Sequence, residues 1–302
     1  MNAAGPACPV LFGEVLFDHF PDGSKVLGGA PLNVALHLQA FGLTPLLLSA
    51  VGADTLGEQI LGRIEAAGLD DRGIGIDAHH PTGTVDVALA DGEPTFSIRP
   101  DVAWDFIASD RAALPATPGL LYHGSLALRR VAARIALGRL RDRLAAPIFL
   151  DVNLRTPWWS RDEVRELVAN ACWIKLNHDE LAALTDTTDE AQGTRQLLDL
   201  GTAELVVVTR GDAGAAAYTR AGGTLAVTPE NTDIKVIDTV GAGDAFASVL
   251  ICGLLYDWPL EVTLDRAQAF ASRIVGCRGA VPDDPALYAA TLAAWQKASI
   301  SL

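Results

Sequence analysis

The stretch 238–244 (DTVGAGD) combines a glycine turn with carboxylates and is followed directly by the apolar run 245–251. Gly241 and Gly243 let the backbone turn sharply and approach a ligand closely. The apolar run predicts a buried helix, whose first turn directs unpaired N–H groups and the positive end of its dipole toward the turn. The residue types therefore predict an anion site formed by the amides of Gly241, Ala242 and Gly243.

Asp244 lies where these amides converge. A carboxylate at that point is well placed to accept a proton from an alcohol that attacks a phosphoryl group. The alternative is that residues 241–243 form only a tight turn, and that Asp244 is an acid near a helix start, where the dipole favours negative charge. The stretch taken alone leaves both interpretations open.

Two motifs resemble those of a known family. The stretch 238–244 resembles the C-terminal signature of the ribokinase-like (PfkB) carbohydrate kinases, D-T-x-G-A-G-D, at every fixed position. The stretch 28–35 (GGAPLNVA) is similar to their N-terminal signature. The resemblance implies transfer of the γ-phosphoryl group of ATP to a primary hydroxyl of a sugar, with Asp244 as the base and Mg²⁺ bridging the nucleotide phosphates.

Three segments look most like fructokinases: 13–18 (GEVLFD), 91–96 (DGEPTF) and 123–126 (HGSL). This likeness implies D-fructose as the acceptor and fructose 6-phosphate as the product. The segment 151–155 (DVNLR) resembles an element shared with 2-keto-3-deoxygluconate kinases, so that activity is the alternative. An acid sugar would need a cation for its carboxylate, and Arg99 is the candidate.

The residues expected to bind the sugar are Asp18, Gly28, Gly29 and Asn33. Asp18 follows a strand predicted at 9–17, where an open α/β sheet places its ligands, although Asp18 could also only cap the turn. The two glycines would let the sugar lie against bare backbone, and Asn33 offers both a donor and an acceptor. In the family, residues matching Asp18, Gly29 and Asn33 hydrogen-bond the sugar hydroxyls.

Arg155, Asn177 and Glu180 follow predicted strands and are candidates for phosphate and magnesium binding. Arg155 could clamp a phosphate in fork geometry, or it could be a surface arginine. Asn177 and Glu180 fit a helix-capping box, which needs no further role. The family's N-x-x-E motif lies at the same point and organises Mg²⁺ and phosphate through water, and both readings can hold together.

Further residues are assigned to the nucleotide by resemblance only. The stretch 208–214 (VTRGDAG) resembles the family's nucleotide turn, and a hairpin turn is its alternative. The residues that would line the nucleotide are Thr209, Gly211 and Gly214. A helix predicted at 268–280 is similar to the adenine-side segment, with Gln268 where relatives often have Asn or His.

Asp238 and Thr239 precede the glycine turn. In several relatives this pair helps to coordinate potassium, which would fix the shape of the turn and add positive field near the phosphates. The alternative is that Asp238 only hydrogen-bonds the turn. No H-x-H or H-E-x-x-H spacing occurs, so a metal site built by the protein alone is not expected.

Strands alternate with helices along most of the chain, and these elements position the candidate site residues. The apolar runs of strand length are 46–51, 120–123, 148–152, 172–176 and 205–209. This alternation predicts an α/β fold with a central, mainly parallel, doubly covered sheet, ribokinase-like by resemblance. Ligands of such a sheet bind at the carboxyl ends of its strands.

The segments 82–89 and 93–99 break this pattern, because they alternate around Asp91-Gly92 as a β-hairpin does. With residues 22–29, the region 82–100 would form a small β lid over the site. In many relatives this lid also supplies a homodimer interface. No linker separates the lid, so we expect a single kinase domain over residues 1–302.

The composition limits the partners of the chain. Its 302 residues are half apolar and carry a net charge of −14, which argues against nucleic acid and anionic membranes. The arginine-rich stretch 129–143 is expected to be a solvated helix face. The N-terminus lacks signal-peptide features, no apolar run could span a bilayer, and the cysteines lack C-x-x-C spacing, so we predict a cytoplasmic protein with reduced thiols.

Two other classes of function fit less well. A catalytically inert sugar- or nucleotide-binding regulator on the same fold would have no need of the base Asp244. A nicotinamide-dependent oxidoreductase would need G-x-G-x-x-G after a strand, which the sequence lacks. The sequence therefore favours an ATP-dependent sugar kinase.

Overall fold

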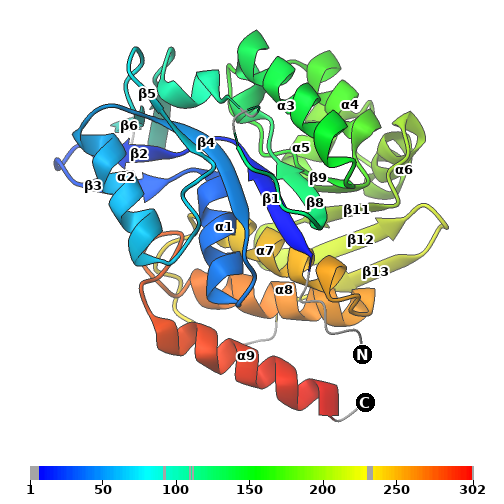
Figure 1. Cartoon of the computed structure of the whole chain (residues 1–302). Helices are drawn as coiled ribbons and strands as arrows, with labels where there is room; N and C mark the ends of the chain where they lie inside the picture. The colour runs from blue at the N-terminus through cyan, green and yellow to red at the C-terminus, as the bar shows by residue number, and fades with distance from the viewer. Residues whose placement is uncertain (1–6, 91–92, 109, 111, 230–233, 301–302) are drawn as a thin grey trace.

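A sheet of nine strands forms the centre of the computed structural model, which describes residues 7–90, 93–108, 110, 112–229 and 234–300 (Figure 1). The strand order is β13-β12-β11-β10-β9-β8-β1-β4-β5. Their bounds are β1 (Cys8–Phe12), β4 (Leu46–Gly52), β5 (Ile74–Asp77), β8 (Pro118–His123), β9 (Ile148–Asp151), β10 (Trp173–Asn177), β11 (Leu205–Thr209), β12 (Ala215–Thr219) and β13 (Thr224–Val227). The pairs β11–β12 and β12–β13 are antiparallel and the other pairs of this sheet are parallel, so the predicted α/β fold with a mainly parallel sheet is confirmed.

Helices cover both faces of this sheet. Successive strand residues point to opposite sides, so the buried apolar side chains form a core on each face. One face packs on α1 (Ala30–Ala40), α2 (Thr55–Ala66), α7 (Ala242–Leu255) and α8 (Leu260–Ile274), and α9 (Pro285–Ile300) packs outside this layer through Tyr288 and Trp295. The other packs on α3 (Val131–Leu144), α4 (Arg161–Asn170), α5 (His178–Leu184) and α6 (Glu190–Leu200). In β1, Leu11 belongs to the first core and Val10 to the second, as alternation requires.

The sheet has a topological switch point beside β1. From β1 the chain builds outward through β4 and β5, and it then returns to β8 on the other side of β1. Ligands of open α/β sheets bind at the carboxyl ends of the strands at such a point. No helix within the described residues is long and apolar enough to cross a membrane.

A second sheet of four strands stands apart from the central one, in the order β3-β2-β6-β7. Its strands are β2 (Leu16–His19), β3 (Lys25–Gly28), β6 (Gly83–Ala90) and β7 (Glu93–Ile98). β6 and β7 form the antiparallel hairpin that the sequence predicts, and its Asp91-Gly92 turn lies outside the described residues. β2 pairs parallel with β6, which joins the hairpin to the N-terminal region.

The single strand predicted at 9–17 is wrong, because the chain leaves the central sheet after Phe12 and enters the small sheet at Leu16. The Gly13 amide donates to the Leu48 carbonyl oxygen at 3.1 Å, and Ser49 Oγ donates to the Gly13 carbonyl oxygen at 2.6 Å. These are the last bonds between this part of the chain and β4, and the regular pairing of β1 with β4 ends here. Asp18 therefore lies on β2 of the small sheet.

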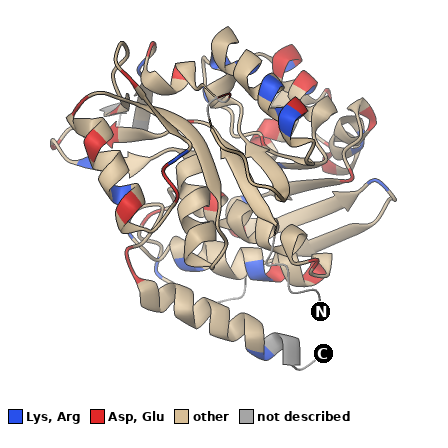
Figure 2. Cartoon of the chain, viewed as in Figure 1, with Lys and Arg blue, Asp and Glu red and all other residues tan. Residues whose placement is uncertain are grey.

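Two helical predictions also change. The helix predicted at 268–280 is α8, which begins at Leu260 and ends at Ile274, so that residues 278–280 lie in the following loop. Most of the arginine-rich face is solvated and carries mixed charges on α3 and α4, where Figure 2 shows basic and acidic residues side by side. Arg129 is the exception, because its side chain is 1 % exposed, pairs with Asp105 and lies 4.0 Å above the Trp104 ring.

Candidate active site

A cavity of ≈ 530 Å³ lies between the carboxyl ends of the central strands, the start of α7 and the small sheet. This volume is in the range of small-molecule sites. Its lining joins the two sequence motifs to three strand ends. The lining residues that come from expected site positions are Asp18, Gly28, Gly29, Asn33, Arg155, Asn177, Glu180, Thr209, Thr239, Gly241, Gly243 and Asp244.

The start of α7 forms one wall of the cavity. No side chain caps this helix, whose N-cap residue is Gly241 with φ 81°. The Ala242 amide donates to the Thr239 carbonyl oxygen at 3.4 Å, whereas the amides of Gly241, Gly243 and Asp244 find no acceptor among the described residues. Free amides at a helix start attract anions, so this wall can hold a phosphoryl group.

Gly241 is required by its surroundings. A Cβ atom added there would lie 2.3 Å from the Ala280 Cβ atom, and a positive φ is unfavourable for other residues. The Ala280 carbonyl oxygen is in turn held by His37 Nε2 at 3.1 Å, and Tyr288 Oη contacts His37 Nδ1 at 2.9 Å. The loop before α9 therefore fixes the glycine turn against the body of the protein.

Asp244 lies in the first turn of α7, half-buried on the cavity wall. Asn33, on α1, donates from Nδ2 to Asp244 Oδ2 at 2.8 Å, so the N-terminal and C-terminal motifs meet directly. Burial raises the pKa of Asp244 to about 7, against the opposing effect of the Asn33 hydrogen bond. A carboxylate with a pKa near neutrality is suited to general-base catalysis.

Lys175 and Asp151 form a buried ion pair behind this wall. Lys175 Nζ lies 2.9 and 3.0 Å from the two carboxylate oxygens of Asp151, and Tyr122 Oη donates to Asp151 Oδ2 at 3.3 Å. Burial alone would lower the pKa of Lys175, but Asp151 holds it above its usual value. A Cβ atom at Gly243 would lie 3.5 Å from Nζ, so a fixed positive charge stands next to the free amides.

The small sheet supplies the opposite wall. Asp18 faces Gly28 across the sheet, where a Cβ atom added at Gly28 would lie 3.0 Å from Asp18 Oδ2. Burial raises the pKa of Asp18 to about 6, and Arg155 lowers it. Gly29 has φ 108° and begins α1, so bare backbone faces the cavity at this point. The geometry leaves hydrogen-bonding groups available to a polyhydroxyl ligand.

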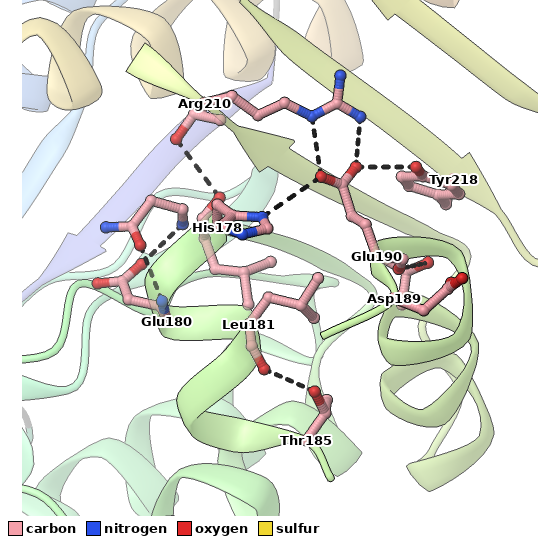
Figure 3. Close-up of polar contacts among 12 residues, drawn as sticks. His178, Glu180, Leu181, Thr185, Asp189, Glu190, Arg210 and Tyr218 are labelled. Carbon is pink, nitrogen blue, oxygen red and sulfur yellow. Dashed lines mark hydrogen bonds and ion pairs between the residues drawn. The ribbon is translucent and has the colours of Figure 1, made fainter. Parts of the chain in front are cut away.

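Glu180 and Asn177 form the capping box that the sequence predicts, and Figure 3 shows the Glu180 carboxylate folded back on the start of α5. Glu180 Oε2 accepts from the Asn177 amide at 2.8 Å, and Oε1 accepts from the Leu154 amide at 2.7 Å. Burial raises the pKa of Glu180, although these amides oppose the shift. Glu180 thus ties α5 to the loop after β9 while still lining the cavity.

The turn after β11 is held from the side of α6. Arg210 and Tyr218 both bond the carboxylate of Glu190, as Figure 3 shows. β11 and β12 form an antiparallel hairpin, so the hairpin interpretation of residues 208–214 is confirmed. The structure gives Gly214 a packing reason, because a Cβ atom there would lie 2.0 Å from the Val227 carbonyl oxygen.

The family is decided by comparison with known proteins. The model of the pfkB family carbohydrate kinases matches residues 11–287. The chain belongs to the pfkB family of carbohydrate kinases. It is 28% identical to a probable fructokinase-7 of Arabidopsis thaliana over 92% of this chain and 90% of that protein.

Two solved structures show the same fold. A fructokinase from Vibrio cholerae with fructose, ADP and calcium bound is 28% identical, with a TM-score of 0.80 over 95% of this chain and 99% of that one. A fructokinase from Xylella fastidiosa with bound ATP is 24% identical, with a TM-score of 0.84 over 97% of this chain and 99% of that one. The ribokinase-like fold inferred from the two motifs is confirmed.

Several expected site residues of this pfkB family member lie away from the cavity. Arg99 lines a separate hollow with His19 and Asp86 on the opposite face of the small sheet, because it follows Ile98, which faces the active-site cavity. Gln268 instead donates to Ser272 Oγ at 3.2 Å within α8. Arg99 does not line the candidate active-site cavity, and the expectation that it pairs with the carboxylate of an acid sugar stays a prediction, as does the nucleotide role of Gln268.

The remaining expected residues are not among those that line the cavity: Asp238, Ala242, Gly211 and Gly214. Asp238 Oδ1 accepts from the Val240 amide at 3.0 Å and Oδ2 from the Gly279 amide at 3.1 Å. These bonds support the interpretation that Asp238 ties the turn, and its potassium role stays a prediction. Gly211 and Gly214 stay predictions as nucleotide contacts.

Sequence reasoning missed Lys175, Asp151 and Glu14 as residues of the site. Asp151 opens the DVNLR element, and Lys175 comes two residues before Asn177, but neither position signals a buried ion pair. Within the described residues, no group of three or more His, Cys, Asp or Glu side chains could hold a metal ion.

Proposed function

We propose that this chain transfers the γ-phosphoryl group of ATP to the 6-hydroxyl of D-fructose. The observation that carries the proposal is the contact between Asn33 and Asp244 at 2.8 Å, in a cavity that also receives the free amides of α7. A base, an anion site and a hydroxyl-binding wall then face one space. Fructose is favoured as the acceptor because the relatives described above are fructokinases.

In the reaction, Asp244 accepts the proton of the sugar hydroxyl as its oxygen attacks the γ-phosphorus. The bond from that phosphorus to the bridging oxygen breaks, and ADP leaves with the electron pair. The amides of Gly241 and Gly243 and the charge of Lys175 stabilise the negative charge on the transferred group. Asn33 holds Asp244 in place, and Asp18 and Gly29 orient the sugar.

The residues fit Mg²⁺ as part of a nucleotide complex. Glu180 and Asp151 are the acids at the cavity side of β9 and β10, and Glu180 would act through a metal-bound water because its two oxygens already accept amides. When bound, Mg²⁺ neutralises charge on the nucleotide phosphates. Thr209 would contact the nucleotide at the end of β11, and Arg155 would clamp a phosphate.

The test is a sugar panel assayed with ATP and Mg²⁺ by ADP release. We expect the highest kcat/KM for fructose among fructose, glucose, mannose, ribose and 2-keto-3-deoxygluconate. A higher value for 2-keto-3-deoxygluconate would make the fructose assignment wrong and leave the kinase assignment intact. No ADP release with any sugar would contradict the proposed kinase activity.

A pair of arginine variants separates neutral from acid sugars. Arg155 and Lys175 are the cations that line the cavity in the described part of the chain, and Lys175 is paired with Asp151. An acid sugar would therefore place its carboxylate near Arg155. Loss of a phosphate contact of Arg155 would affect all sugars alike, so Arg155→Gln should weaken use of the acid sugar more than use of fructose, whereas Arg99→Gln, on the far face of the small sheet, should affect neither substrate.

A further inference from the structure

Glu14 is a buried acid that has no task in the reaction described above. It lies between β1 and β2, and its side chain lines the same cavity as Asn33 and Asp244. Glu14 is 3 % exposed, and its Oε2 has no hydrogen-bond partner among the described residues. A buried carboxyl oxygen without a partner costs stability, so its presence calls for a ligand that satisfies it.

The backbone around Glu14 is rigidly held. The bonds of Gly13 to Leu48 and Ser49 fix the segment against β4. On the other side, a Cβ atom at Gly29 would lie 2.5 Å from the Glu14 carbonyl oxygen, so the first motif packs directly on this segment. Glu14 is therefore presented at the carboxyl end of β1, at the switch point where the sheet gathers its ligands.

The charges near Glu14 place it with the reacting groups. Burial and the carboxylates of Asp151, Asp244 and Glu14 all raise the pKa of Tyr122. Burial also raises the pKa of Glu14 itself, while its own amide, Arg155 and the Ala30 amide oppose the shift. The shift favours the protonated carboxyl group, which can donate a hydrogen bond as well as accept one.

We propose that Glu14 binds a hydroxyl group of the sugar and determines which sugars the kinase accepts. The inference rests on the proposed sugar kinase function and assigns the unpaired Oε2 to the substrate. The bound hydroxyl satisfies Oε2, whereas a sugar without that hydroxyl leaves it unpaired. A site built in this way rejects the analogue that lacks the hydroxyl more strongly than an apolar pocket can.

A purely structural role makes the opposite prediction about stability. An acid that serves the fold is paired in the free protein, and its removal lowers the free energy of unfolding. An acid kept for a ligand has a carboxyl oxygen without a partner in the free protein, as Glu14 Oε2 has, and its replacement by an apolar side chain of similar size stabilises that form. Stability and sugar binding therefore change in opposite directions only if Glu14 serves the substrate.

The experiment compares wild type with Glu14→Leu, Glu14→Gln and a control, Glu65→Gln, in which an exposed glutamate on α2 is changed. Tm is measured without and with fructose, fructose binding is measured by calorimetry, and kcat/KM is measured for fructose and singly deoxygenated fructose analogues. We expect Glu14→Leu to have a Tm without sugar at least equal to wild type, and to lose the rise in Tm that fructose causes.

The kinetic pattern identifies the hydroxyl. In Glu14→Leu, kcat/KM for fructose should fall at least about 10-fold. For the one analogue that lacks the contacted hydroxyl, wild type and variant should have equal kcat/KM, as in a double-mutant cycle. Glu14→Gln, which keeps a donor and an acceptor, should show the same selectivity with a smaller loss, and Glu65→Gln should match wild type.

Two results would overturn the assignment of Glu14. One is a Glu14→Leu protein with a lower Tm that binds fructose like wild type. The other is a fall in kcat/KM of equal size for fructose and for every deoxygenated analogue. Glu14→Gln tests this even if Glu14→Leu does not fold. Failure of the proposed function is a separate result, because wild type itself would then release no ADP with any sugar.

Discussion

Replacement of Asp244 by Asn isolates the proton transfer. Asn33 Nδ2 donates to Asp244 Oδ2 at 2.8 Å, so the new amide must turn its oxygen toward Asn33 to keep that bond. Its NH₂ group then occupies the position of the oxygen that Asp244 offers the substrate in wild type. The variant keeps the size of the side chain and its contact with α1, but it cannot accept the hydroxyl proton.

The expected loss falls on kcat. General-base catalysis contributes about 10²- to 10⁴-fold, or about 3 to 5 kcal/mol of the barrier. ATP binding through the amides of α7 should persist, because those amides do not depend on the charge of residue 244. Removal of a carboxylate beside the phosphates should leave the Kd of ATP unchanged or slightly lower.

The same change should stabilise the protein. The pKa of Asp244 rises from 3.8 to about 7, so the ionised carboxylate destabilises the fold at every pH above its folded pKa. At about 1.4 kcal/mol per pKa unit, the upper limit is about 4 kcal/mol. Water in the cavity reduces this cost, so we expect Asp244→Asn to gain about 1 to 3 kcal/mol of unfolding free energy near pH 8.

The assay combines steady-state kinetics, titration with ATP and urea unfolding on one preparation. The matched control is Asp257→Asn, since Asp257 is exposed just past the other end of α7 and adopts a positive φ that Asn tolerates. The control should keep wild-type kcat and stability. A near-normal kcat in Asp244→Asn would refute the base role and reduce Asp244 to an acid at a helix start.

Four further predictions follow from the cavity. The pKa of Asp244 is about 7 and that of Asp18 is about 6, so kcat/KM for the sugar should fall below pH about 7, as Asp244 is protonated, and more steeply below pH about 6, as Asp18 is protonated. Asp18→Asn should remove the steeper part of this fall. Lys175→Met leaves Asp151 buried without its cation, so the free energy of unfolding measured in urea should fall by about 3 to 5 kcal/mol. The double variant with Lys175→Met and Asp151→Leu should recover the stability but not kcat. Gly241→Ala places a Cβ atom 2.3 Å from that of Ala280, so Tm should fall, with ATP affinity weakened more than fructose affinity. If the residues before the glycine turn hold potassium, replacement of potassium by a bulky organic cation at constant ionic strength should lower kcat, and equal rates would discard that site.

The sequence predicted the part of the site in which short motifs bring the residues together. Gly241, Gly243 and Asp244 are consecutive at a helix start, so their chemistry follows from local geometry alone. Gly29 and Asn33 lie at the start of α1, and the strand alternation predicts that this start faces the carboxyl ends of the sheet.

The rest depends on register and burial, which a single sequence does not reveal. Lys175 and Asp151 come from neighbouring strands, and their pairing depends on the parallel register of β9 and β10. Glu14 looks like part of an extended strand until the break between β1 and β2 turns it into the cavity. The sequence placed Arg99 only in the lid and did not show which face of the small sheet it joins, because neighbouring residues of an extended chain point to opposite faces.

The most direct test of the account is the fate of the γ-phosphate, followed by ³¹P NMR with ATP, Mg²⁺ and fructose. Wild type should form ADP and fructose 6-phosphate in equal amounts, and Asp244→Asn should form neither at a comparable rate while still binding ATP. Formation of ADP and inorganic phosphate without any sugar phosphate, or equal product formation by Asp244→Asn, would contradict it.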